Sequence, residues 1–93
     1  MAKTAAAAHS FKVGVNYLIR GVTHYYTGRL KAVTETDLVL GDAAWIADTG
    51  RFADALANGT LNEVEPFAGD VIVSRAAVVD ATEWTHALPR TQK

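Results

Sequence analysis

The segment from residue 28 to residue 43 reads GRLKAVTETDLVLGDA and carries the strongest structural signal in the chain. Two apolar stretches flank Thr34–Asp37, a polar run whose side chains are typical of a turn. Gly28 lies inside a β-rich run, which predicts a bend or bulge. The segment therefore predicts two antiparallel strands of a small curled sheet. The second of them continues to Ile46 and is expected to be the best-buried strand.

The residues before Gly28 extend this pattern toward the N-terminus. Apolar side chains alternate with a period of two at Val13, Val15, Tyr17 and Ile19, which predicts a strand. Arg20-Gly21 then predicts a turn, so the first two strands form a hairpin. Further upstream, a threonine precedes four alanines, and this favours a short helix over residues 4–10.

Residues 48–69 read as an elaborated excursion between two strands. A short helix is predicted over Arg51–Asn58, with Thr49 as its cap and Gly59 as its stop. The part from residue 60 to residue 67 is ambiguous, because Pro66 disfavours a central strand.

Two very short apolar strands close the pattern, at Val71–Val73 and Val78–Val79. Neither contains the lysine or proline that normally protects an exposed strand edge, so we expect another copy of the chain to cover them. Residues 89–93 are a polar tail expected to fray. The whole pattern predicts a mainly β domain with a short N-terminal helix and about five strands, as in a small barrel.

Composition restricts the class of protein. The chain has 93 residues and a formal net charge of −1, so we expect a single domain, residues 1–93, without a globally basic surface. It has no cysteine, which excludes disulfides and thiolate chemistry. No apolar run approaches the roughly 20 residues that span a bilayer, and no secretory signal is evident. We expect a cytoplasmic protein with no membrane partner.

Two segments resemble the Sm-like family, the RNA-associated barrels that include the Sm and Hfq proteins. Gly28-Arg29-Leu30 followed by the run from Asp37 to Ala43 looks like the first Sm motif. The run from Val71 to Val79 is similar to the second motif. The resemblance implies a strongly bent five-stranded antiparallel SH3-like barrel.

The resemblance also implies a closed ring of about five to seven copies, in which the fourth strand of one copy pairs with the fifth strand of the next. The implied interface consists of Val71, Ile72, Val73, Val78 and Val79. In the family, RNA bases bind in two loops near the central pore. Carried over by position, those loops supply Thr34, Glu35, Thr36, Asp37, Arg75 and Ala76.

Further basic side chains are candidate contacts for nucleic acid. Arg20, Arg29 and Lys31 are the candidate basic contacts. The alternative interpretation is that they occupy ordinary solvent-exposed strand positions.

The sequence offers few candidates for an enzyme active site. The three histidines lack metal-ligand spacing, and no nucleophile or phosphate-binding motif occurs. We therefore expect no enzyme activity, no catalytic residues, no metal and no cofactor. The leading hypothesis is a non-enzymatic ring that binds RNA or single-stranded nucleic acid. The alternative is a structural homo-oligomeric ring or assembly component of a larger particle, without nucleic-acid binding of its own.

Overall fold

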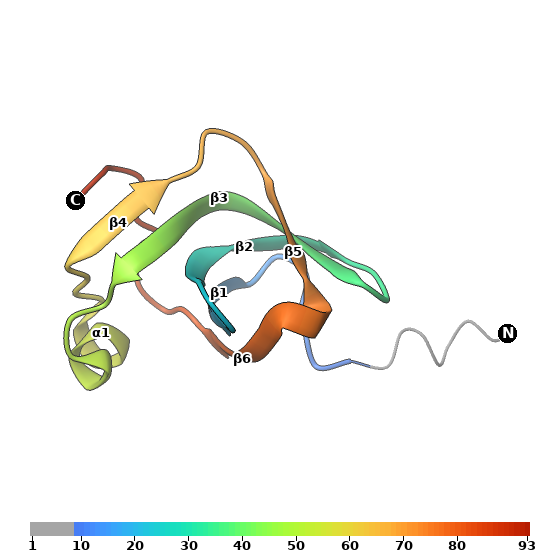
Figure 1. The fold of residues 1–93 in the computed structure, drawn as a ribbon, viewed down its shortest axis with the longest axis horizontal. Coiled ribbons are helices and arrows are strands. Elements are labelled where there is room, and N and C mark those ends of the chain that lie inside the picture. Colours follow the sequence, from blue (N-terminus) through green and yellow to red (C-terminus); the bar gives the residue numbers. More distant parts are fainter. Residues whose placement is uncertain (1–8) are drawn as a thin grey trace, which may run out of the picture.

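The computed structural model describes residues 9–93, which form six strands and one α-helix (Figure 1). In chain order these are β1 Asn16–Gly21, β2 Tyr25–Val33, β3 Asp37–Asp48, α1 Phe52–Asn58, β4 Glu63–Pro66, β5 Val71–Ser74 and β6 Val78–Glu83. One turn of 3-10 helix, Arg75–Ala77, joins β5 to β6. Every strand pair is antiparallel, so the prediction of a mainly β domain is confirmed.

The sheet is organised around β3, the longest strand at 12 residues. Its strand order is β4-β3-β2-β1-β6, and β5 pairs with β3 beside this path. One edge of β3 pairs with β2, while the other edge pairs with β5 near its start and with β4 near its end (Figure 1). Within residues 9–93, β6 pairs only with β1 and β5 only with β3, so the sheet is open.

The bend predicted at Gly28 is present as an irregularity between β2 and β3. The pairing register shifts between Thr27 and Arg29, opposite a β3 segment in which Asp42 has the left-handed φ of 49°. A Cβ atom at Gly28 would lie 3.0 Å from the Cβ of Leu40 and 3.2 Å from that of Ala43. The two strands approach this closely only because residue 28 has no side chain.

The sheet packs a separate hydrophobic cluster on each of its faces. One cluster lies under the curl made by β5 and contains Tyr17, Ile19, Leu30, Leu38, Leu40, Ala43 and Val73. The other lies under α1 and the C-terminal segment and contains Leu18, Ala44, Ile46, Ala55, Leu61, Val64 and Trp84. β3 has six buried residues, more than any other strand, but they are half of its 12 residues, the same fraction as in β1.

Three local predictions need correction, and a fourth is confirmed. The turn expected at Arg20-Gly21 is formed by residues 22–24 instead, because both residues belong to β1. The first strand begins at Asn16 rather than near Val13, because Gly14, with a φ of 92°, turns the preceding chain and donates its N–H to the carbonyl of Leu30. Arg51, not Thr49, occupies the N-cap of α1 and makes no side-chain cap bond. The predicted C-terminal stop is confirmed, since Gly59 ends α1 in the left-handed conformation.

Residues 60–67, for which the sequence pattern is ambiguous, contain β4, one strand more than the five predicted. Pro66 ends β4, which pairs only with β3, so proline occupies the edge position that tolerates a missing N–H. The helix expected over residues 4–10 lies largely outside the described residues, and the structure describes only His9 and Ser10 of it, neither of them helical.

The C-terminal segment is docked on the domain rather than frayed. The backbone of Lys93 exchanges two hydrogen bonds with Val64, of 2.9 and 3.0 Å. The guanidinium of Arg90 donates to the carbonyls of Ala43 and Phe67. His86 Nε2 donates to the Leu56 carbonyl over 2.8 Å, which satisfies an acceptor near the end of α1. Residues 84–93 therefore cover one face of the sheet together with α1.

We predict that Gly28→Ala lowers the free energy of unfolding by about 1–3 kcal/mol, because the added methyl group overpacks the β2–β3 contact. Gly69→Ala is the matched control, since a Cβ atom there would meet nothing within 4 Å. Urea unfolding of both variants measures the difference. Equal stability of the two variants would show that the close approach at residue 28 does not constrain the sheet.

Candidate functional site: a loop corner and two open strand edges

The two loops expected to bind RNA meet at one corner of the molecule. The turn between β2 and β3, Thr34–Thr36, lies beside the 3-10 helix Arg75–Ala77, because Ser74 at the end of β5 pairs with Asp37 at the start of β3. The backbone N–H of Arg75 donates to the Thr36 carbonyl over 2.8 Å. Its guanidinium donates to the Thr34 carbonyl over 2.5 Å. Arg75 therefore ties the two loops together.

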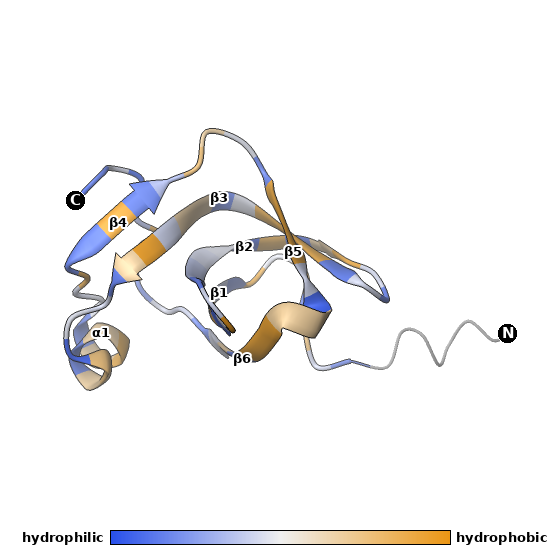
Figure 2. Ribbon diagram, in the orientation of Figure 1, coloured by the Kyte–Doolittle hydropathy of each residue, from blue (hydrophilic) through white to orange (hydrophobic). Residues whose placement is uncertain are grey.

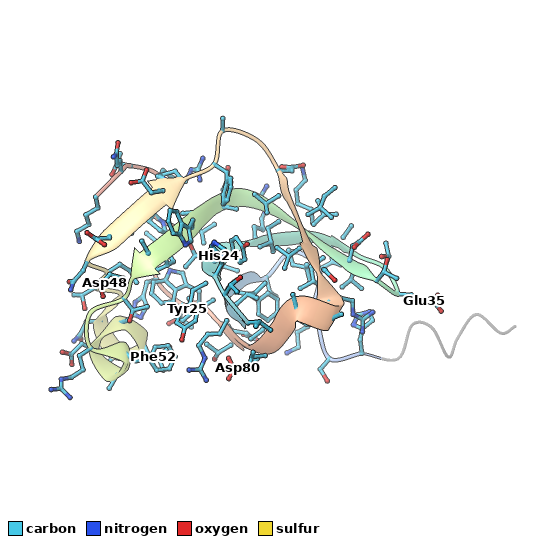
Figure 3. All side chains as sticks on the ribbon, in the orientation of Figure 1. His24, Tyr25, Glu35, Asp48, Phe52 and Asp80 are labelled. Atoms are coloured by element: carbon cyan, nitrogen blue, oxygen red, sulfur yellow. The ribbon has the colours of Figure 1, made fainter. Side chains whose placement is uncertain are left out.

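The turn itself is stabilised by Thr34. Its hydroxyl accepts the N–H groups of Thr36 and Asp37, over 3.2 and 2.9 Å. This bonding leaves Glu35 exposed at the tip, at the opposite end of the molecule from Asp48 (Figure 3). The guanidinium carbon of Arg75 also lies 6.0 Å from the centroid of the Phe11 ring.

The charge at this corner is unfavourable for a phosphate backbone. Arg75 is half-buried, and its guanidinium already donates a hydrogen bond to the Thr34 carbonyl. The exposed Glu35 and the half-buried Asp37 each add a carboxylate. Ala76 is exposed and contributes only a methyl group. The structure thus brings all six predicted RNA-binding residues together, with one cation and two acidic side chains among them.

The three candidate basic contacts are each paired with a carboxylate. Arg20 on β1 donates twice to Asp80 on β6, and its guanidinium stacks 4.8 Å from the Phe52 ring centroid. This arrangement lies on the side of the molecule where Tyr25, Phe52 and Asp80 come together (Figure 3). Arg20 is therefore remote from the loop corner.

Arg29 and Lys31 form a second group over Gly41. Arg29 pairs with Asp42, and the ammonium of Lys31 lies 2.7 Å from Asp70. A Cβ atom at Gly41 would meet both basic side chains, which places them side by side. The acidic partners of the three basic residues were not expected from the sequence, because strand register and the excursion bring them together from 13 to 60 residues away.

The pKa values follow these pairings. Hydrogen bonds from Arg29 lower the pKa of Asp42, and hydrogen bonds from Arg20 lower the pKa of Asp80. The same bonds with Asp80 raise the pKa of Arg20. The positive charge expected for nucleic acid is thus largely compensated within the fold.

The residues of the implied ring interface divide into an inner and an outer group. Val73 is buried, and Val71 and Val78 pack against the cluster beneath β5. Ile72 and Val79 point outward, with 70% and 64% of their surfaces exposed. The outer edges of β5 and β6 pair with no other strand in residues 9–93, and Figure 2 colours β5 and the start of β6 as hydrophobic.

A shallow hollow adjoins the exposed edge of β5. It lies between that strand and the β1–β2 loop, and its lining includes Val22 and Ile72. Val22 is 73% exposed, so two exposed aliphatic side chains form an apolar rim of the hollow, whose lining also includes the polar Thr23, His24 and Ser74. Such a rim beside an unpaired strand is typical of a surface that another chain covers.

A second hollow was missed by the sequence analysis. It opens at the far end of β3 and is lined by Thr23, His24, Trp45 and Asp48, among others. His24 directly precedes β2, and Trp45 lies on β3. No motif in the sequence relates His24 to Trp45, because the two residues are brought together by the pairing of β2 with β3, in which Tyr26 lies opposite Trp45.

The part of the chain from residue 9 to residue 93 holds no group of three or more side chains that could bind a metal ion. No helix among the same residues is long and apolar enough to cross a membrane.

We predict that the protein loses stability as the pH falls below about 4, because carboxylates with lowered pKa values stabilise the folded state only while ionised. The double variant Asp42→Asn/Asp80→Asn is expected to be less stable at pH 7 and to lose less stability on acidification. Thermal unfolding from pH 7 to pH 3 measures this difference. Glu35→Gln, which removes a carboxylate outside the ion pairs, should keep the wild-type pH dependence. A double variant with the same dependence would contradict the assignment.

No protein family model, curated protein or solved structure matches this chain. The geometry of the corner, the edges and the hollows is therefore the basis for a functional proposal.

Proposed function

We propose that this chain is a non-enzymatic structural protein that assembles into a closed homo-oligomeric ring of about five to seven copies. In the ring, β5 of one copy pairs with β6 of the next. The observation that carries the proposal is the pair of unpaired strand edges, each with a large exposed aliphatic side chain, Ile72 on β5 and Val79 on β6. Each edge leaves backbone N–H and C=O groups available to another strand.

The strand order supports an Sm-like barrel as the subunit. β4 and β5 pair with successive parts of the same edge of β3, so they act as one interrupted strand. Counted in this way, the order becomes fourth-third-second-first-fifth, with the last strand beside the first. β5 and β6 then belong to the fourth and fifth strands, which are the interface strands that the sequence resemblance implies.

Assembly follows from the position of the two edges. The two edges belong to different strands, so the contact between copies is heterologous. Each copy pairs through β5 with one neighbour and through β6 with the other. A closed ring leaves neither edge exposed. Desolvation of Ile72, Val79 and Val22 adds a hydrophobic contribution to the backbone hydrogen bonds.

A second candidate function is contact with RNA or single-stranded nucleic acid at the loop corner. The observation that favours it is the bridge from Arg75 to Thr34, which joins the two loops that the resemblance implies. A ring would repeat Arg75 around its axis, in each copy together with the carboxylates of Glu35 and Asp37. The compensated charges of Arg20, Arg29 and Lys31 make the structural role the better-supported one.

We predict that native mass spectrometry at low salt detects a closed oligomer of about five to seven copies. Ile72→Lys and Val79→Lys should each shift the population toward monomer, because a lysine on an edge strand opposes pairing. Val13→Lys is the matched control, since Val13 is 62% exposed and precedes β1. A monomeric wild-type protein, or equal dissociation by the control, would refute ring assembly through these edges.

We predict further that, if the corner binds nucleic acid, a single-stranded oligonucleotide binds in a salt-sensitive manner and Arg75→Ala weakens this binding by about tenfold. Arg51→Ala, which removes an exposed cation at the start of α1, should leave the affinity unchanged. Fluorescence anisotropy at two salt concentrations measures both variants. Absence of binding at low salt by an intact oligomer would eliminate the second candidate and leave the structural role.

A further inference from the structure

We propose that the hollow at the end of β3 binds an arginine side chain presented by a basic segment of another protein. This site, defined by His24, Trp45 and Asp48 and called the aromatic hollow below, has a volume of about 340 Å³. It is distinct from the loop corner, because Asp48 lies at the opposite end of the molecule from Glu35 (Figure 3).

Aromatic rings form one wall of the aromatic hollow. The ring centroids of His24 and Trp45 are 5.7 Å apart, and the imidazole of His24 also stacks on Tyr26 at 6.3 Å. Trp45 keeps 37% of its surface exposed, although it is a large aromatic residue on the longest strand. An exposed indole face is the preferred partner of a cation in cation–π contacts.

A carboxylate is available in the same hollow. Asp48 ends β3, and its Oδ1 accepts the N–H of Gly50 over 2.8 Å, which fixes the orientation of the side chain. The other oxygen has only a long contact of 3.5 Å from the amide of Asn62. Asp48 therefore retains acceptor capacity for a guanidinium that lies on Trp45.

The chain already contains this arrangement in an internal form. Arg20 is held by two hydrogen bonds from its guanidinium to Asp80 while it stacks on Phe52. A carboxylate beside an aromatic ring thus accommodates an arginine in this fold. The aromatic hollow offers the same two groups to solvent, and no ion pair in residues 9–93 includes Asp48.

Acidic side chains on β4, beside the strand that lines the aromatic hollow, favour a cationic occupant. Glu63 lies directly opposite Asp48 across the β3–β4 pair, and Glu65 lies directly opposite Trp45. Like charges at opposed positions on neighbouring strands repel each other, and a bound cation relieves that repulsion. Both glutamates are exposed and take part in no ion pair within the described chain. A basic protein segment complements this surface, whereas a phosphate backbone is repelled by it.

The experiment is a titration of the full chain with a blocked pentapeptide, Gly-Gly-Arg-Gly-Gly, followed through the NMR signal of the Trp45 indole N–H. The matched probe contains citrulline in place of arginine, which keeps the shape and removes the charge. We expect the arginine peptide alone to shift the Trp45 signal, and Asp48→Asn to weaken its binding by about fivefold. Glu35→Gln should leave binding unchanged.

Glu65→Gln provides a second variant on β4, outside the turn that Asp48 stabilises, and should also weaken binding. Equal shifts by the citrulline peptide, unchanged affinity in both carboxylate variants, or the same shift with an oligonucleotide would overturn the proposal. A Trp45 shift that depends on protein concentration without peptide would assign the hollow to a second copy instead. The Val79→Lys variant separates this test from ring assembly, because Val79 lines neither hollow and the variant should bind the peptide equally well.

Discussion

Backbone pairing along β3 is the constraint on which the rest of the structure depends. This strand bonds to β2 on one edge and to β5 and then β4 on the other, and it contributes buried residues to the clusters on both faces of the sheet. A strand that pairs with three neighbouring strands in this way has to bend. The close approach at Gly28 and the left-handed Asp42 provide that bend. As β5 curls over one face, its outer edge and that of β6 are left without a partner in the described chain.

Features encoded by neighbouring residues could be predicted from the sequence. The irregularity at Gly28 and the helix stop at Gly59 each follow from a local conformational preference. The β1–β2 hairpin is also present, with its turn at residues 22–24 rather than at Arg20-Gly21. The two short strands around Ser74–Ala77 are also present, with β6 extended to Glu83. The excess length of β6 could not be predicted, because its polar residues gain their strand conformation by pairing with β1.

Features that depend on tertiary contacts were beyond the sequence. The C-terminal residues look like a polar tail, yet Arg90 and Lys93 find backbone partners on β3 and β4. Likewise, Arg20, Arg29 and Lys31 read as solvated cations until the register places an aspartate beside each. These pairings change the functional interpretation. They remove most of the free positive charge and leave strand edges, an apolar rim and an acidic aromatic hollow as the distinctive surfaces.

In the proposed ring, the outer edges of β5 and β6 are hydrogen-bonded to other copies in solution. Amide hydrogen exchange tests this claim most directly, because only hydrogen-bonded amides are protected for long periods. We expect the outward-facing amides of Val71–Ser74 and Val78–Glu83 to exchange as slowly as those of β2, which is paired on both edges. Exchange as rapid as that of the exposed loop residues 68–70 would contradict it.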